Sequence, residues 1–373
     1  MKIDSLTVRR LQIPLKTTFS QANNSTSLSD SMIAAVTTTS GIWGYGESCP
    51  RPYVTGEDPA SVIEDIRKIQ PALMNQTFEG LEDIQRLLQE EFGRLIRPAA
   101  LCTIELALLD AWAKTHQQSV LEMLGGAYRE HYQYCAVLPM ASLSTAQQLL
   151  RRFRHIGFKE IKLKINEDLS LTQQKIALVK EVMGSSTRIR LDVNCAWDLA
   201  TAKAQIPSLL EAGVTNFEQI FEATQLDQFK EITQEFGKDA QIAVDEGLNG
   251  PESAQRLIDE GIGNQFNLKI SKHGGILATL DICQRARRHG VGYQLGAHFG
   301  ETSLLSSAGI IIASLVEDLS SLEGAFGTHL LEYDISTTPL QFGKGGAIRD
   351  VSDQLAPYGL GIQLSESLNS SIS

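Results

Sequence analysis

Short apolar segments in the middle of the chain end in five polar stretches, which read Lys162-Leu163-Lys164, Asp192-Val193-Asn194, Glu218-Gln219, Asp245-Glu246 and Asn267-Leu268-Lys269. Three consecutive segments therefore end in carboxylates, and the segments on either side of them end in lysines. The spacing of these stretches indicates the fold.

Eight such apolar segments follow one another along the chain. Their ends lie near Met140, Lys164, Asp192, Glu218, Asp245, Lys269, Gly296 and Gly324, so that successive gaps are 24, 28, 26, 27, 24, 27 and 28 residues. A period of this size holds one strand, one loop and one crossover helix. The pattern predicts a parallel α/β barrel of the TIM type with the arrangement (β/α)7β.

The first 125 or so residues follow a different pattern. We predict strands at Ile3–Leu15, Ser31–Ser40 and Ile42–Glu47, with a turn at Thr39-Ser40-Gly41. Helical patterns follow at Pro59–Ile69, Leu81–Leu95 and Ala99–Leu124. We therefore expect an α+β domain over residues 1–125, to which residues 345–373 return, and a barrel domain over residues 126–344.

Composition excludes several classes of protein. The 373 residues carry a net charge of −11 and no long basic run, which disfavours nucleic acid as a partner. No apolar run reaches the eighteen residues that a membrane span needs, and the start of the chain does not resemble a signal peptide. The five scattered cysteines lack C-x-x-C spacing and indicate a reducing compartment. We expect a cytoplasmic protein without membrane or nucleic-acid partners, and assembly as a homo-oligomer stays open.

The polar stretches place their side chains at one end of the predicted barrel, where active sites of this fold lie. Lys162 and Lys164 are two residues apart on a strand and share a face. Three carboxylates converging there would repel one another without a cation. Oxygen ligands suit a hard divalent ion, so we expect Mg²⁺, with Mn²⁺ as an alternative, on the ligands Asp192, Glu218 and Asp245.

Lysines near such an ion indicate a reaction type. A lysine that is desolvated or lies near a cation has a lowered pKa and can act as a base near neutral pH. If it removes the proton next to a substrate carboxylate, an ene-diolate forms, and a metal ion stabilises the charge on its oxygens. The expected partner is therefore a small-molecule carboxylate. His298, at the seventh strand end, could be a ligand or an acid, but a substrate-lining or packed histidine is favoured. Glu301 could orient a lysine or cap the next helix.

The sequence resembles the enolase superfamily, in particular its muconate-lactonizing-enzyme-like subgroup, over nearly the whole chain. In the first domain the similarity lies in Gly44-Tyr45-Gly46-Glu47, Tyr53-Val54-Thr55-Gly56-Glu57 and Glu105-Leu106-Ala107-Leu108-Leu109-Asp110. In the barrel it lies in the five polar stretches, in the same order and spacing.

The resemblance implies roles for individual residues. Asp192, Glu218 and Asp245 would bind Mg²⁺, while Lys164 and Lys269 would be an acid/base pair on opposite sides of the substrate α-carbon. Lys162 would hold the substrate carboxylate. The first domain would act as a capping domain whose loops near Phe19–Thr26 and Pro50–Gly56 close over the barrel. Substrate contacts are expected from Asn23, Arg51, Tyr53, Asn194, His298, Glu301 and Phe326.

The subgroup hosts several reactions on one scaffold. Two bases on opposite faces favour racemisation or epimerisation of an amino-acid derivative, which could be N-acylated, betaine-like or a dipeptide. Dipeptide epimerases usually carry Asp-x-Asp at the eighth strand end, whereas this chain has Gly324-Ala325-Phe326-Gly327, so a free ammonium group is disfavoured. A dehydratase of the o-succinylbenzoate synthase type or a muconate-type cycloisomerase is the main alternative. A phosphate-binding barrel isomerase and a non-catalytic barrel fit less well, because each of the five polar stretches carries the expected carboxylate or lysine.

Overall fold

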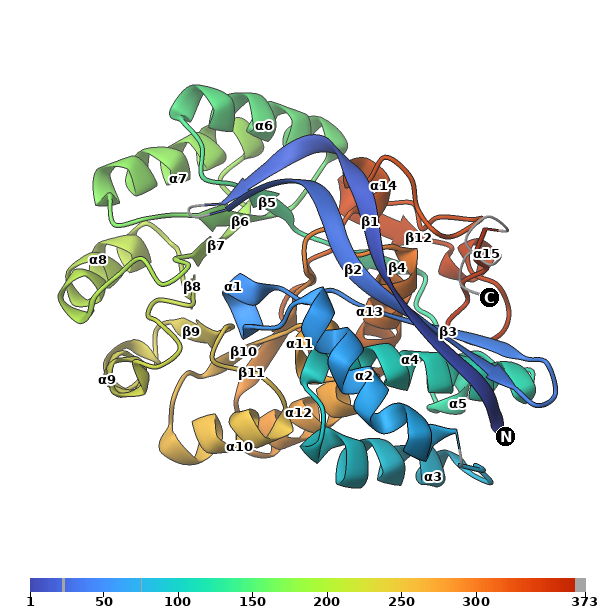
Figure 1. Ribbon diagram of the computed structural model, residues 1–373. Coiled ribbons are helices and arrows are strands. Elements are labelled where there is room, and N and C mark those ends of the chain that lie inside the picture. The colour runs from blue at the N-terminus through green and yellow to red at the C-terminus, as the bar shows by residue number, and fades with distance from the viewer. Residues whose placement is uncertain (22–23, 75, 366–373) are drawn as a thin grey trace.

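The computed structural model describes residues 1–21, 24–74 and 76–365 and has two parts. A small antiparallel sheet with helices comes first, and a ring of parallel strands wrapped by helices follows (Figure 1). The predicted fold class, an α+β domain next to a (β/α)7β barrel, is confirmed.

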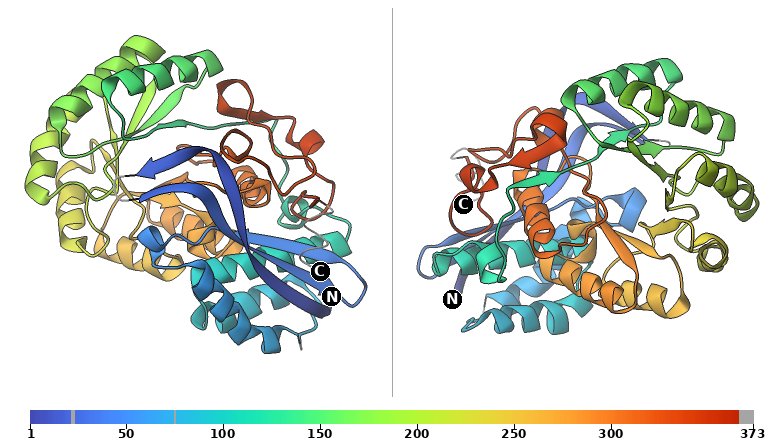
Figure 2. Two further views of the ribbon diagram at one scale, coloured as in Figure 1. Left: turned by 45° about the horizontal axis from the view of Figure 1, so that its top comes forward. Right: turned by 180° about the vertical axis from the view of Figure 1, so that it is seen from behind.

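The antiparallel sheet has the strand order β1-β2-β3, with bounds Ile3–Gln21, Asn24–Thr38 and Trp43–Ser48. The predicted turn is present, since Gly41 has φ +81° and its N–H donates to the Thr38 carbonyl at 2.8 Å. β1 and β2 run further than predicted, because Phe19 pairs with Thr26 after a register shift. The described part of the expected loop is therefore the end of a long hairpin, which reaches towards the barrel (Figure 2).

Helices cover one side of this sheet. Their bounds are α1 Pro52–Thr55, α2 Pro59–Leu73, α3 Leu81–Arg86, α4 Pro98–Thr115 and α5 Val120–Met123. Two predicted helices are shorter than expected: α3 continues as π and 3-10 turns over 87–94, and α4 stops before Gln117, whose φ of 54° is left-handed. Gly44 and Gly46 let α4 lie directly on β3, since a Cβ at either position would come within 2.2 Å of an α4 carbonyl oxygen.

The barrel strands pair in the order in which they occur in the chain. They are β5 Ala136–Leu138, β6 Glu160–Lys164, β7 Arg188–Asp192, β8 Asn216–Glu218, β9 Gln241–Val244, β10 Gln265–Leu268 and β11 Gly292–Leu295. Parallel bridges from Leu322 to Leu295 and from Glu323 to Cys135 close the ring, so residues 322–323 act as the eighth strand. The near-constant spacing of the polar stretches thus reports the barrel repeat.

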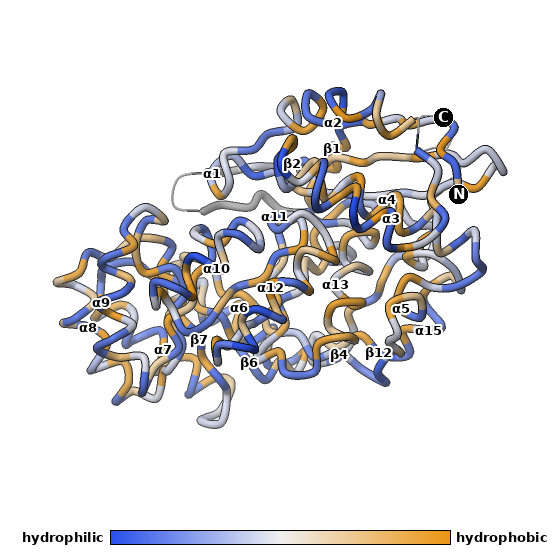
Figure 3. The backbone as a smooth tube through the Cα atoms, turned by 90° about the horizontal axis from the view of Figure 1, so that it is seen from below, coloured by the Kyte–Doolittle hydropathy of each residue, from blue (hydrophilic) through white to orange (hydrophobic). Residues whose placement is uncertain are grey.

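Helices alternate with the strands around the outside. They are α6 Leu143–Ile156, α7 Leu169–Met183, α8 Leu199–Glu211, α9 Leu226–Phe236, α10 Pro251–Glu260, α12 Ile276–Arg288 and α13 Ser303–Leu315. A short, fully buried helix, α11 Ile270–His273, lies between β10 and α12. Hydrophilic and hydrophobic residues are interleaved along these helices (Figure 3), as expected where one face packs on the barrel. No helix in the described part of the chain is long and apolar enough to span a membrane.

The end of the described chain returns to earlier segments. It contains α14 Gly327–Leu330, a 3-10 turn at Lys344–Gly346, β12 Ala347–Arg349 and α15 Val351–Gln354. β12 pairs with β4 (His131–Gln133), and the Leu360 N–H donates to Asp110 of α4 at 2.7 Å. The return therefore contacts both parts, and the domain boundaries at residues 125 and 345 stay a prediction.

Candidate active site

Strand register brings the ends of β6, β7 and β8 to one level of the barrel. Lys164 pairs with Asp192, and Asp192 pairs with Glu218. Asp245 and Lys269 directly follow β9 and β10. The five side chains therefore lie on neighbouring strands in the order predicted from the sequence.

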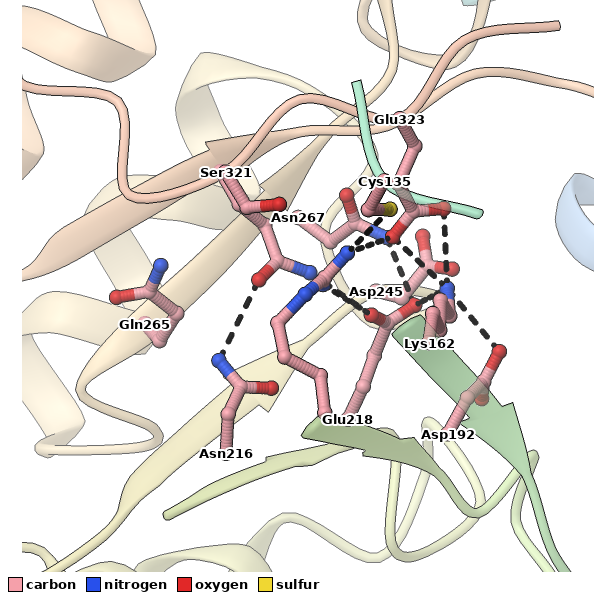
Figure 4. A network of polar contacts seen from close by, with 12 residues as sticks. Cys135, Lys162, Asp192, Asn216, Glu218, Asp245, Gln265, Asn267, Ser321 and Glu323 are labelled. Atoms are coloured by element: carbon pink, nitrogen blue, oxygen red, sulfur yellow. Dashed lines mark hydrogen bonds and ion pairs between the residues drawn. The ribbon is translucent and has the colours of Figure 1, made fainter. Parts of the chain in front are cut away.

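Lys162 lies inside this group rather than at its rim. Its Nζ is 2.6 Å from Glu218 Oε1, 3.1 Å from Asp192 Oδ2 and 3.2 Å from Glu323 Oε1, an arrangement shown in Figure 4. Burial acts to lower the pKa of Lys162, but the charges of Asp192, Glu218 and Glu323 outweigh it and raise the pKa well above its usual value. Lys162 is therefore a fixed positive charge at neutral pH.

Glu218 is completely buried and held from three sides. Besides Lys162, the side-chain amides of Asn267 and Gln294 donate to its two oxygens, each at 2.8 Å. Burial raises the pKa of Glu218 to about 7, although the charge of Lys162 opposes the shift. These donors fix the direction of its carboxylate.

Lys269 and Lys272 both contact Asp245. Lys269 Nζ lies 2.5 Å from Asp245 Oδ2, and Lys272 Nζ lies 2.6 Å from Oδ1 while also bonding the Asp245 carbonyl. Burial favours a low pKa at Lys269, but Asp245 raises the pKa above its ordinary value. At Lys269 the charge of Asp245 thus outweighs burial, whereas at Lys272 burial outweighs Asp245 and lowers the pKa.

Lys164 stands at the opposite end of the row. Its Nζ bonds Asn194 Oδ1 at 2.7 Å and lies 3.4 Å from Asp192 Oδ2. Asn194 has a left-handed backbone, with φ 45°, which turns its side chain towards the lysine directly above β7.

A second charged layer lies below the carboxylates and was not predicted. Arg190 donates to Glu160 and Glu323, each at 2.7 Å. Arg190 and Glu160 stand two residues before Asp192 and Lys162, so they point to the same face of their strands. That alternation could have revealed them, and the K-x-x-K spacing after β10 could have revealed Lys272.

The predicted substrate-binding residues differ in their exposure and in their packing. Tyr53 on α1 is 48% exposed, whereas Asn23 lies outside the described residues. Phe326 packs in an aromatic cluster, with ring centroids 4.5 Å from Phe342 and 5.8 Å from Phe158. These contacts make Phe326 part of a packed wall.

Arg51, His298 and Glu301 meet at the loop after β11. The Arg51 guanidinium donates to the carbonyls of Asp30 and Phe299, each at 2.5 Å, and to the Pro50 carbonyl. Glu301 accepts from the His298 backbone N–H at 2.5 Å. Arg51 therefore holds backbone, and Glu301 closes its own loop, while Thr302 caps α13.

The donor set suits a hard divalent cation. Asp192, Glu218 and Asp245 supply carboxylate oxygens from three consecutive strands, which is the ligand chemistry of Mg²⁺. No three His, Cys, Asp or Glu side chains in the described part of the chain are already gathered as metal ligands. Lys162 Nζ lies 3.1 Å from Asp192 and 2.6 Å from Glu218. The residues fit a divalent ion through the chemistry of their carboxylate oxygens.

Comparisons with known proteins cover the whole site. Residues 4–125 match the family model described as "Mandelate racemase / muconate lactonizing enzyme, N-terminal domain", and residues 144–368 match "Enolase C-terminal domain-like". The N-succinyl-L-Arg/Lys racemase of Bacillus cereus is 27% identical over 87% of each chain. Muconate cycloisomerase 1 of Rhodococcus opacus is 26% identical over 92% of each chain.

A solved structure agrees with these relatives. It is the dipeptide epimerase of Enterococcus faecalis in complex with Mg and the dipeptide L-Leu-L-Tyr. It superposes with a TM-score of 0.86 at 25% identity, covering 97% of this chain and 100% of that one. The similarity therefore extends over both parts of the fold.

Proposed function

The chain belongs to the mandelate racemase and muconate lactonizing enzyme family of the enolase superfamily, and from this premise we propose that it racemises or epimerises an amino-acid derivative. It is an isomerase of that superfamily. The reacting atom would be the carbon next to a substrate carboxylate. One observation carries the proposal: Lys164 and Lys269 end the second and the sixth strand of an eight-membered ring, so they face each other across the barrel mouth.

Two lysines on opposite sides suit inversion at one carbon. One lysine, as the neutral amine, takes the α-proton from one face, and the electron pair moves into the carboxylate to give an ene-diolate. The other lysine, as the ammonium, returns a proton to the opposite face. No atom is gained or lost, and the configuration is inverted. The buried cation of Lys162 would bind the substrate carboxylate.

We infer that Asp192, Glu218 and Asp245 hold Mg²⁺, with Mn²⁺ as an alternative. The ion supplies stabilisation of the negative charge that develops on the substrate carboxylate. It would also lessen the pull of Asp245 on Lys269, whose nearest carboxylate oxygen is 2.5 Å away. Lowering the pKa of Lys269 in this way would let it act as the base.

The substrate is proposed to be a small carboxylate with an N-acylated, betaine-like or peptide nitrogen. Relatives with printed activities on N-succinyl amino acids and on dipeptides support this class. Asn23, Tyr53, Asn194, His298 and Glu301 are proposed to line the site, whereas Arg51 and Phe326 would shape it through packing. A cycloisomerase or a related lyase is the second candidate, because muconate cycloisomerase 1 of Rhodococcus opacus aligns over 92% of its own length.

Exchange of the α-proton tests the proposal. The protein would be incubated with Mg²⁺ in D₂O and separate pools of N-acyl amino acids, dipeptides, proline betaines and hydroxy acids. We expect a mass gain of one unit at unchanged composition in an amino-acid-derivative pool, because deprotonation would be reversible. Loss of water or ring closure without exchange would favour the lyase or cycloisomerase instead. Omitting the metal, with a chelator present, should abolish exchange.

A further inference from the structure

The imidazole of His298 is buried without a partner. His298 is 4% exposed, and neither of its ring nitrogens has a hydrogen-bond partner among the described residues. A buried polar atom without a partner costs free energy and is rare in native proteins. His298 contributes two such atoms in the loop after β11, at the end of the barrel where the charged residues of β6 to β10 lie.

The backbone around this ring is firmly held. Glu301 accepts from the His298 N–H, Arg51 donates to the Phe299 carbonyl, and Ser29 Oγ donates to the Gly300 carbonyl at 2.6 Å. Arg51 and Ser29 come from the antiparallel part of the chain, so the loop is fixed from outside the barrel. The ring is thus oriented by its backbone and left without a partner of its own.

The charges around the ring select the kind of group it can bind. Burial and the charges of Lys269, Arg51 and Lys272 lower the pKa of His298 well below its usual value, while the charge of Asp245 acts to raise it. The ring is therefore neutral, with one N–H donor and one acceptor nitrogen. The positive charges of Lys269, Arg51 and Lys272 act on this ring, so its surroundings favour an oxygen acceptor over an ammonium group.

The eighth strand offers no free anion either. Glu323 is the one carboxylate in residues 321–327, and it is engaged by Arg190 at 2.7 Å and by Lys162 at 3.2 Å. A charged nitrogen on the substrate would thus lack a counter-ion on this side of the site. An acylated nitrogen is neutral and brings a carbonyl oxygen.

We propose that His298 is a specificity-determining residue that donates a hydrogen bond to the acyl oxygen on the substrate's α-nitrogen, which makes the substrate an N-acyl amino acid. This inference rests on the proposed function and narrows its substrate class. It gives the unpartnered ring nitrogen an acceptor when substrate is present.

A double-mutant cycle tests the proposal, in which one change is made at His298 and the other at a single atom of the substrate. An N-acetyl amino acid and its N-thioacetyl analogue differ only in oxygen against sulfur, a much weaker acceptor. We expect the native protein to prefer the oxygen compound by about tenfold in kcat/KM, mainly through KM. In His298→Leu the preference should fall to within about twofold, whereas His298→Asn, which keeps a donor, should retain part of it.

Two controls separate the outcomes. His289→Leu removes an exposed histidine and should leave the tenfold preference unchanged. A preference that persists in His298→Leu, or a kcat that falls equally for both substrates, would overturn the specificity role. If the native protein exchanges only betaines, whose nitrogen carries no acyl oxygen, the His298 inference fails while the proposed function stands. If it exchanges dipeptides but no N-acyl amino acids, the proposed restriction to N-acyl amino acids fails. If it exchanges the α-proton of no carboxylate, the proposed function fails.

A spectroscopic measurement does not depend on turnover or on variants that fold. With ¹⁵N-labelled histidine, saturating N-acetyl amino acid and Mg²⁺ should shift the ring signals of His298. His273 serves as the reference within the same sample, because both of its ring nitrogens already have partners in the Lys269 N–H and the Leu248 carbonyl. Unchanged His298 signals at saturation would contradict the proposal.

Discussion

Single residues carry the proposed chemistry, and Lys164 and Lys269 have different partners. Lys269 is held against Asp245 at 2.5 Å, while Lys164 bonds the neutral Asn194 at 2.7 Å. Because the two lysines follow opposite strands of the ring, the proposal assigns them to opposite faces of the substrate, and the stereochemistry of exchange can distinguish their roles.

Replacing either lysine should abolish racemisation but affect the two enantiomers differently. In Lys164→Ala and in Lys269→Ala, exchange into D₂O should survive for one enantiomer at most, and for opposite enantiomers in the two variants. The measurement is the initial exchange rate from each pure enantiomer. Lys203→Ala, which removes a lysine in an exposed ion pair with Glu231, should keep both rates. Racemisation by either active-site variant would show the two-base assignment to be wrong.

Arg190 and Arg188 are two residues apart on β7 and contact the same carboxylate, Glu160. Arg190→Met should lower the free energy of unfolding by about 3–5 kcal/mol, because it removes the buried cation that lies between Glu160 and Glu323. Glu160 then keeps only the exposed Arg188, and Glu323 keeps only the longer contact with Lys162. Arg188→Met should cost less than about 1 kcal/mol, since that side chain is 64% exposed. Urea unfolding of the two variants measures the difference, and equal losses would contradict the role of the buried layer.

At the scale of elements, buried carboxylates of the first part lie at the starts of barrel helices. Glu47 accepts from the Thr302 and Leu305 N–H groups at the start of α13. Glu105 accepts from the Leu277 N–H at the start of α12, whose own N-cap is a glycine. The unpaired N–H groups of a helix start attract such oxygens, so these contacts join the two parts of the fold.

Glu105 should make stability depend on pH. Burial raises its pKa to about 8 from an ordinary 4.5, although backbone N–H donors oppose the shift. The folded protein keeps a proton that the unfolded chain loses, so this group makes stability fall as pH rises between roughly 4.5 and 8. In Glu105→Gln the free energy of unfolding relative to the native protein should rise by roughly 3–5 kcal/mol from pH 5 to pH 9.

Thermal unfolding at several pH values checks this prediction. The exposed Glu211→Gln should show no such change between pH 5 and pH 9. If the free energy of unfolding of Glu105→Gln differed from that of the native protein by the same amount across this range, the Glu105 carboxyl would be ionised throughout.

At the scale of the whole molecule, the two parts share one core. Buried hydrophobic residues form a contiguous cluster across the sheet, its helices and the barrel. Leu360 joins them, since its N–H donates to Asp110 of α4 and its carbonyl accepts from Ser307 of α13. We propose that the two predicted domains do not unfold independently but unfold together as one cooperative unit.

Unfolding should therefore be a single transition seen alike by circular dichroism and by calorimetry. Leu360→Ala should lower its midpoint without splitting it, with a loss of about 2–5 kcal/mol, because the side chain is fully buried. Gln363→Ala, at an exposed position nearby, should leave the midpoint in place. Two separate transitions in the native protein would show that the parts unfold independently.

The sequence by itself determined the fold class and predicted the charged residues that end the barrel strands, but it did not reveal Arg190, Glu160 or Lys272. Strand ends recur at a constant spacing and side chains alternate along a strand, and both are local properties. These properties were enough to place Asp192 beside Glu218 and to put Lys164 across the ring from Lys269. Helix ends were predicted less well, because single residues such as Gln117 decide them.

Only the tertiary structure decided which partner each charged group has. The bond from Ser29 to Gly300 spans 271 residues, and that from Glu47 to Thr302 spans 255. No local pattern encodes such contacts, which follow from how the sheet docks on the barrel. In the buried site, Asp245 raises the pKa of Lys269, because charges act strongly where water is excluded. The same tertiary arrangement leaves the His298 ring without a hydrogen-bond partner among the described residues.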